Sequence, residues 1–154
     1  IEDALLVQQY AIVPLPGGGG SGMADAAGDD VEAILASWEE NSNVGEPERG
    51  KSVYDNAAPS ERGELLGCAG CHAGGVQAPA TDLTWDAVIA ERLTLAQFAG
   101  YTPEQYLVES IVHPNDYIVP GYQPGVMPQN FANRMSSQDL ADIVAYLQTY
   151  STSQ

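Results

Sequence analysis

The only two cysteines of this 154-residue chain lie three positions apart, and a histidine follows the second one directly, in Cys68-Ala69-Gly70-Cys71-His72. Two cysteines are too few for a disulfide-stapled scaffold. In a single helical turn, however, both thiols can reach neighbouring vinyl groups of a porphyrin and form thioethers with them, which places the histidine under the iron. The motif therefore predicts one covalent c-type haem, attached through Cys68 and Cys71, with His72 as an axial ligand.

Other interpretations of the motif have to be weighed. A thioredoxin-like redox pair belongs at a strand-to-helix junction of an alternating β/α chain. A structural zinc site requires four ligands, and the chain has no second Cys-x-x-Cys and no histidine pair. The remaining alternative is a haem-free interaction module with a Cys68–Cys71 disulfide, whose denatured mass would equal that of the bare sequence.

The second axial ligand has to come from elsewhere in the chain, and Met127 is the main candidate. It lies in the segment Pro124-Gly125-Val126-Met127-Pro128, which proline braces on both sides. A thioether is a weak neutral ligand, so it holds iron best where the backbone presents it with little conformational freedom left to lose. The sequence therefore predicts His72 and Met127 as the two iron ligands.

Three other residues are possible ligands by type. His113 is the main rival, but it precedes Pro114 at a predicted helix end, where an imidazole usually caps carbonyls or meets solvent. Met135 comes just before the predicted start of the last helix and is expected to pack in the core. Met23 lies next to a glycine-rich stretch and is the weakest candidate.

Apolar residues recur with the helical period in several segments, and no segment alternates as a half-buried strand does. The clearest helix follows Ser136, which forms a capping box with Asp139 ahead of an apolar stripe. Thr102 and Gln105 mark a similar start for a helix that ends before Pro114. The sequence therefore predicts an all-α fold. Further helices are expected at residues 31–38 after a cap at Asp29 or Asp30, from 46–47 to before Pro59, at 65–72 and at 84–93, with a proline-stiffened loop at 115–128.

Two parts of unequal character make up the chain. Residues 1–28 are expected to be a mostly irregular extension, because residues 17–22 have the composition of a flexible linker. Residues 29–154 are expected to form one domain with an additional N-terminal helix. Since the sequence begins with Ile1 rather than Met, we expect an N-terminus that is either processed or incomplete, and a signal peptide or a membrane anchor could have stood before it. The apolar runs are far shorter than the roughly 20 residues that cross a bilayer.

The charge is strongly negative, with 21 Asp and Glu against 5 Lys and Arg, for a formal net charge of −16. Phosphate binding requires clustered cations, so nucleic acid is excluded as a partner, and an anionic membrane surface is disfavoured for the same reason. The acidity either serves solubility or steers the protein towards a basic docking patch on a redox partner.

The segments Glu46-Pro47-Glu48-Arg49-Gly50-Lys51-Ser52-Val53-Tyr54 and Ile143-Val144-Ala145-Tyr146-Leu147, together with the cysteine motif and the methionine loop, resemble the class I cytochromes c. The resemblance covers about residues 45–150 and implies four to five short helices around one haem. In that family the first and last helices cross, and a glycine on the first lets an aromatic side chain of the last pack closely. Gly50, Tyr146 and Tyr54 match the positions involved.

The same resemblance implies two further haem contacts. A proline after the cysteine motif accepts, through its carbonyl, the ring N–H of the axial histidine, and Pro79 resembles it. Leu83 resembles the apolar residue that packs on the haem, although the spacing from Pro79 is longer than the usual Pro-x-Leu. The walls of the haem pocket are expected to include Leu65, Leu66, Val76, Leu83, Leu95, Phe98, Tyr122 and Val126.

Residues 110–115, 117–122 and 127–131 are similar to the monohaem cytochrome c subunits of bacterial respiratory assemblies, such as alternative complex III and the cytochrome c domains of haem-copper oxidases. This resemblance implies a one-electron carrier that is not itself an enzyme and that works beside other subunits of a membrane respiratory complex. A free periplasmic shuttle, and a haem enzyme or gas sensor with an open sixth position, are the alternatives. Covalent haem attachment takes place outside the cytoplasm, so the expected location is the periplasm or the outer face of the membrane.

Overall fold

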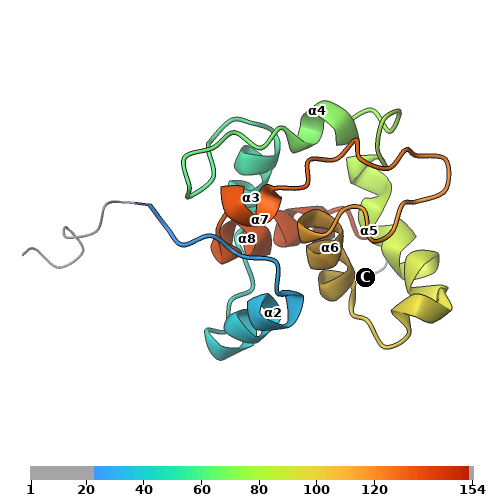
Figure 1. Ribbon diagram of the computed structural model, residues 1–154, viewed down its shortest axis with the longest axis horizontal. Helices are drawn as coiled ribbons and strands as arrows, with labels where there is room; N and C mark the ends of the chain where they lie inside the picture. The colour runs from blue at the N-terminus through green and yellow to red at the C-terminus, as the bar shows by residue number, and fades with distance from the viewer. Residues whose placement is uncertain (1–22, 153–154) are drawn as a thin grey trace, which may run out of the picture.

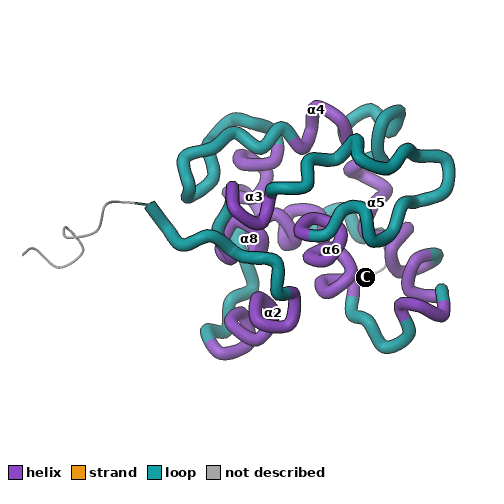
Figure 2. The backbone as a smooth tube through the Cα atoms, in the orientation of Figure 1, coloured by secondary structure: helices purple, strands orange, loops and turns teal. Residues whose placement is uncertain are grey.

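Regular structure in the described part of the chain, residues 23–152 of the computed structural model, consists of helices alone (Figures 1 and 2). The predicted all-α class is confirmed. In chain order the helices are α2 (Val31–Glu40), α3 (Pro47–Tyr54), α4 (Cys68–His72), α5 (Thr81–Ala90), the 3₁₀ turns η1 (Arg92–Thr94) and η2 (Ala96–Phe98), α6 (Pro103–Val112), α7 (Phe131–Arg134) and α8 (Ser137–Gln148).

Helices α3 and α8 cross at very short distance, as the resemblance implied. A Cβ atom built on Gly50 would lie 1.9 Å from the backbone carbonyl oxygen of Asp142, so only glycine fits this position of α3. One turn further along, the rings of Tyr54 and Tyr146 meet edge to face with centroids 5.4 Å apart. The crossing holds the first and last parts of the domain together.

Arg49 joins the same two helices by charge. Its guanidinium donates to Asp139 at 2.6 Å and also to Asp142, and both carboxylates are fully buried on α8. Asp142 accepts a further hydrogen bond from the backbone N–H of Glu46 at 2.7 Å. Buried carboxylates are stable only when paired and hydrogen-bonded, so this cluster fixes how α3 meets α8.

The predicted additional N-terminal helix is present as α2. Asp30 caps it by accepting from the N–H of Ala33 at 3.0 Å, which decides between the two expected caps. Ile34 and Trp38 are buried, and the Trp38 indole donates to the Ser137 hydroxyl at 2.8 Å, at the start of α8. Of the expected extension at residues 1–28, residues 1–22 lie outside the described part of the chain.

The predicted helix starts at Thr102 and Ser136 are confirmed. The Thr102 hydroxyl accepts from the N–H of Gln105 at 3.1 Å, and Ser136 forms a reciprocal capping box with Asp139. Between α6 and α7 the chain has no helix, as expected for the proline-rich loop, and in Figure 1 this loop runs beside α4. A hydrogen bond of 3.2 Å from the Tyr122 hydroxyl to the Gly75 carbonyl joins the loop to the turn after α4.

Helices α4, α5 and α7 differ from the prediction. Helix α4 begins at Cys68 rather than residue 65, because Gly67 takes the left-handed conformation with φ of 75° and interrupts any earlier helix. Helix α5 begins at Thr81, three residues early, and gives way to 3₁₀ turns near Arg92. Helix α7 was not predicted, since four residues are too few to show a helical period.

Candidate haem-binding site

Helix α4 presents both thiols to one large cavity. Gly67 turns the chain into the helix, and its N–H donates to the Asn56 side chain at 2.7 Å. Cys68 and Cys71 both line the cavity and are not joined in a disulfide. Burial raises the pKa of the Cys68 thiol to about 11, so this sulfur lacks the thiolate character of a thioredoxin-type cysteine.

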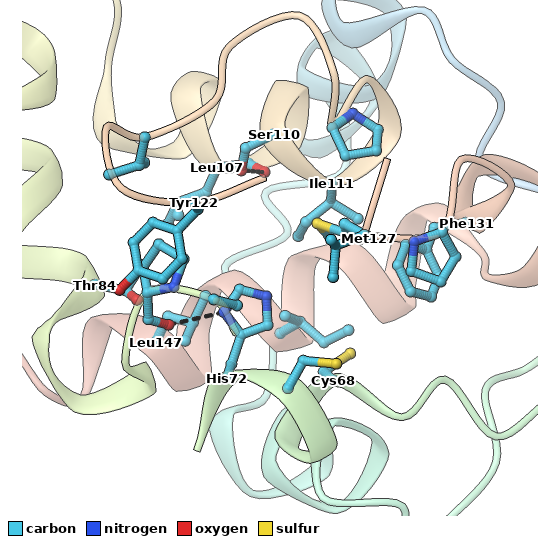
Figure 3. A pocket seen from close by; sticks show the side chains of 18 of the residues that line it. Cys68, His72, Thr84, Leu107, Ser110, Ile111, Tyr122, Met127, Phe131 and Leu147 are labelled. Atoms are coloured by element: carbon cyan, nitrogen blue, oxygen red, sulfur yellow. Dashed lines mark hydrogen bonds between the residues drawn. The ribbon is translucent and has the colours of Figure 1, made fainter. Parts of the chain in front are cut away.

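The imidazole of His72 is oriented by a backbone contact. Its Nδ1 lies 2.8 Å from the Pro79 carbonyl oxygen, and because a carbonyl only accepts, Nδ1 carries the proton. Burial lowers the pKa of His72, which keeps the ring neutral. Its Nε2 lone pair is then free for a metal, and Figure 3 shows that nitrogen facing the cavity. This is the contact that the resemblance implied for Pro79, and it orients a ligand as partners in the outer shell of metal sites do.

Met127 lines the same cavity from the loop between α6 and α7. Figure 3 shows it across the cavity from His72 and Cys68. The loop is braced locally, because the Gly125 N–H donates to the Asn115 side chain at 2.9 Å and the Gln129 amide donates to the Met127 carbonyl at 2.8 Å. The chain thus brings an imidazole nitrogen and a thioether sulfur to opposite sides of one space.

The rival ligands lie elsewhere or serve other purposes. His113 does not line the cavity, and its Nε2 lies 2.7 Å from the Asp29 carbonyl oxygen. Met135 does reach the cavity wall, but it is a fully buried member of the core, as expected. Met23 is 58% exposed and lies away from the cavity.

The cavity has a volume of about 290 Å³ and is lined mainly by apolar side chains from α3, α5, α6, α8 and the methionine loop. Of the expected wall residues, Leu66, Tyr122 and Val126 line it. Phe98 instead packs among three tyrosines of the core. Leu65, Val76 and Leu95 lie on the surface.

Leu83 is also misplaced in the prediction. It is 64% exposed and takes no part in the cavity wall. The reason is the early start of α5, whose buried residues Thr81, Trp85 and Val88 define a face that Leu83 does not share. Among the apolar residues that do line the cavity are Leu107 and Ile111 of α6.

Arg92 is the residue of the site that the sequence interpretation missed. It is only 8% exposed, and among the described residues that line the cavity it is the one Lys or Arg. Its ion-pair partner is Glu91, whose side chain is 68% exposed. A cation buried beside an apolar cavity requires negative charge nearby. The sequence offered one signal for this residue. Arg92 lies between two apolar segments, in a chain that has only five Lys and Arg residues.

These features together fit a haem. Two thiols on one helical turn match two vinyl groups, an imidazole and a thioether on opposite sides match two axial positions, and Arg92 suits the carboxylates of the porphyrin. The apolar wall suits the macrocycle itself. We find no group of the cavity that the haem would leave mismatched.

A family model of cytochrome c matches residues 47–151, which is more than half of the chain. The chain belongs to the cytochrome c family. It accordingly binds a covalent c-type haem, takes part in haem-based electron transfer and works with redox partners rather than as an enzyme. Comparison with curated proteins and with solved structures gave no match. No helix within residues 23–152 has the length and apolar character needed to cross a membrane.

Proposed function

We propose that this protein is a one-electron carrier whose haem iron is held by His72 and Met127. The observation that carries the proposal is the position of these two side chains, which face one cavity from opposite sides. When haem is bound, His72 and Met127 would hold its iron from both sides, so that substrate or gas would not reach the iron directly. A soft thioether opposite an imidazole favours the ferrous state and therefore gives a relatively positive reduction potential.

Each part of the site has its own task. The haem, when bound, supplies an iron that changes between the ferrous and ferric states. Pro79 keeps the proton of His72 on Nδ1 and fixes the orientation of the ring. The apolar wall excludes water, which limits the reorganisation that accompanies a change of charge. Arg92, the cation of the cavity wall, would offset the negative charge of the porphyrin carboxylates.

Two measurements on the purified protein test this proposal. The denatured mass should exceed that of the sequence by one haem, whereas a haem-free disulfide module would show no increase. The oxidised protein should show the weak far-red absorption band that marks methionine bound to ferric haem. Met127→Leu should abolish the band, and Met135→Leu is the matched control, since Met135 also touches the cavity but is expected to keep the band. A band that survives Met127→Leu would show that another methionine binds the iron. A wild-type ferric protein without the band would instead reopen the sixth position for a peroxidase or a gas sensor.

We further propose that the carrier works outside the cytoplasm, as a subunit of a membrane respiratory complex of the alternative complex III type. Its support is the resemblance of residues 110–115, 117–122 and 127–131 to such subunits, together with the linker-like residues 17–22. Size-exclusion chromatography of gently solubilised native membranes tests it, with haem staining as the readout. Haem that elutes with a large assembly supports the subunit role. Haem that elutes alone, at the size of the monomer, would instead indicate a free periplasmic shuttle.

A further inference from the structure

The segment that leads into α2 is bound to the rest of the domain by its backbone. We call residues 24–30 the strap; they precede residues 47–151, which match the family. The N–H of Ala27 donates to the Met135 carbonyl at 2.8 Å, and the N–H of Gly28 donates to the Ala132 carbonyl at 3.1 Å. The strap is therefore tied to α7 and to the residue that follows it.

Arg62 adds a second tie between the strap and α7. Its Nη1 donates to the Ala24 carbonyl at 2.7 Å, and its Nε donates to the Asn133 carbonyl at 2.6 Å. One guanidinium thus spans from the beginning of the strap to the middle of α7. Helix α7 follows directly on the loop that carries Met127.

The strap also reaches the other end of that loop. His113 is the C-cap of α6 and the last residue before Pro114, where the loop begins. Its Nε2 lies 2.7 Å from the Asp29 carbonyl oxygen, and because a carbonyl only accepts, Nε2–H is the donor. The loop therefore leaves from a residue that holds the strap and returns to a helix that also holds it.

We propose that the strap is a positioning element for Met127, with His113 and Arg62 as the positioning residues. Between its ends the loop has no helix or strand, so the place of Met127 depends strongly on where the ends are fixed. A thioether ligand that is presented in a fixed place binds more firmly, because less freedom is lost when the bond forms. Holding both ends from one segment stabilises the methionine–iron bond without any contact to the iron.

This inference rests on the proposed role of Met127 as an iron ligand. The experiment therefore tests the ligand and the strap by separate readouts. In the full-length ferric protein, added imidazole competes with Met127 for the iron, and loss of the far-red band follows the exchange. His113→Ala removes one hydrogen bond at a loop end and should raise the apparent affinity for imidazole about fivefold. Arg62→Met should act in the same direction. His113→Gln, whose amide can still donate to the Asp29 carbonyl, should restore part of the wild-type affinity.

Thr102→Ala is the matched control. Thr102 caps the opposite end of α6, so its loss weakens the same helix while leaving both ends of the loop tied. The inference is wrong if His113→Ala and Arg62→Met both bind imidazole as the wild type does, or if Thr102→Ala raises the affinity equally. If Met127→Leu leaves the far-red band in place, the proposed ligand fails, and the strap inference that rests on it fails with it. If the band is lost in Met127→Leu but the imidazole affinities do not change in His113→Ala and Arg62→Met, only the strap inference fails. If His113→Ala does not accumulate with haem, the imidazole affinity of Arg62→Met alone decides whether the strap positions Met127.

Discussion

Replacing Gly50 with alanine tests how close the two crossing helices are. The new Cβ would lie 1.9 Å from the Asp142 carbonyl oxygen and 2.4 Å from its carbonyl carbon, both of them backbone atoms that cannot rotate away. To reach an ordinary contact of 3.4 Å, α3 and α8 would have to separate by about 1.5 Å. Overfilling of this kind costs about 1–3 kcal/mol and more where backbone must move, while alanine regains about 0.5–1 kcal/mol of helix stability. We expect the free energy of unfolding to fall by about 2 kcal/mol.

Chemical denaturation of the haem-loaded protein, followed by far-ultraviolet circular dichroism, measures this loss. The matched control is Gly74→Ala, because a Cβ at Gly74 meets nothing within 4 Å and its φ is not positive. That variant should stay within about 0.5 kcal/mol of the wild type. Because Ile143 and Leu147 of α8 line the cavity, Gly50→Ala should also shift the haem absorption. Equal stabilities of the two variants would refute the close crossing.

Three further changes have expected outcomes. Arg49→Met leaves two fully buried carboxylates without their cation, so the free energy of unfolding should fall by about 2–3 kcal/mol. This is at or below the usual cost of breaking a buried pair, because Arg49 is partly exposed, and denaturant titration measures it. Arg92→Met removes a positive charge from the cavity wall and therefore favours ferric haem, so potentiometry should show a reduction potential lower by some tens of millivolts. Burial and the Tyr150 hydroxyl raise the pKa of Tyr146 above its ordinary 10.0, so the unfolded chain loses this proton first as pH rises. Stability should therefore fall above pH 10, and Tyr146→Phe should reduce that fall; an identical pH profile in the variant would contradict the assignment.

The sequence predicted those features that depend on local pattern. The capping box at Ser136 and the stripe behind it specify α8 without any tertiary information. The cysteine motif determines where a haem can be attached, and the glycine at position 50 indicates a close crossing once the family is recognised. In each case the chemistry requires neighbouring residues at fixed spacing.

The features that the sequence did not predict depend on tertiary packing. Leu83 was misplaced because the face of a short helix changes with its starting residue, and α5 starts three residues early. Arg92 gave only a weak signal, since its burial depends on tertiary neighbours such as Tyr106 rather than on its neighbours in sequence. The contact between His113 and Asp29 joins residues 84 positions apart, which no local pattern reveals.

The distribution of positive charge restricts how this carrier can recognise a partner. All five Lys and Arg residues lie in the described part of the chain, and each already donates to a carboxylate or a backbone carbonyl. The partners are Asp139 and Asp142 for Arg49, Asp55 for Lys51, Ala24 and Asn133 for Arg62, Glu91 for Arg92, and Glu64 and Leu65 for Arg134. No local cluster of cations is therefore left to attract an acidic surface. The net charge of −16 acts over the whole molecule, and such a field accelerates encounter with a basic partner while salt screens it. Charge can thus bring a basic partner close from many directions, but the final orientation of the haem towards it has to come from short-range contacts.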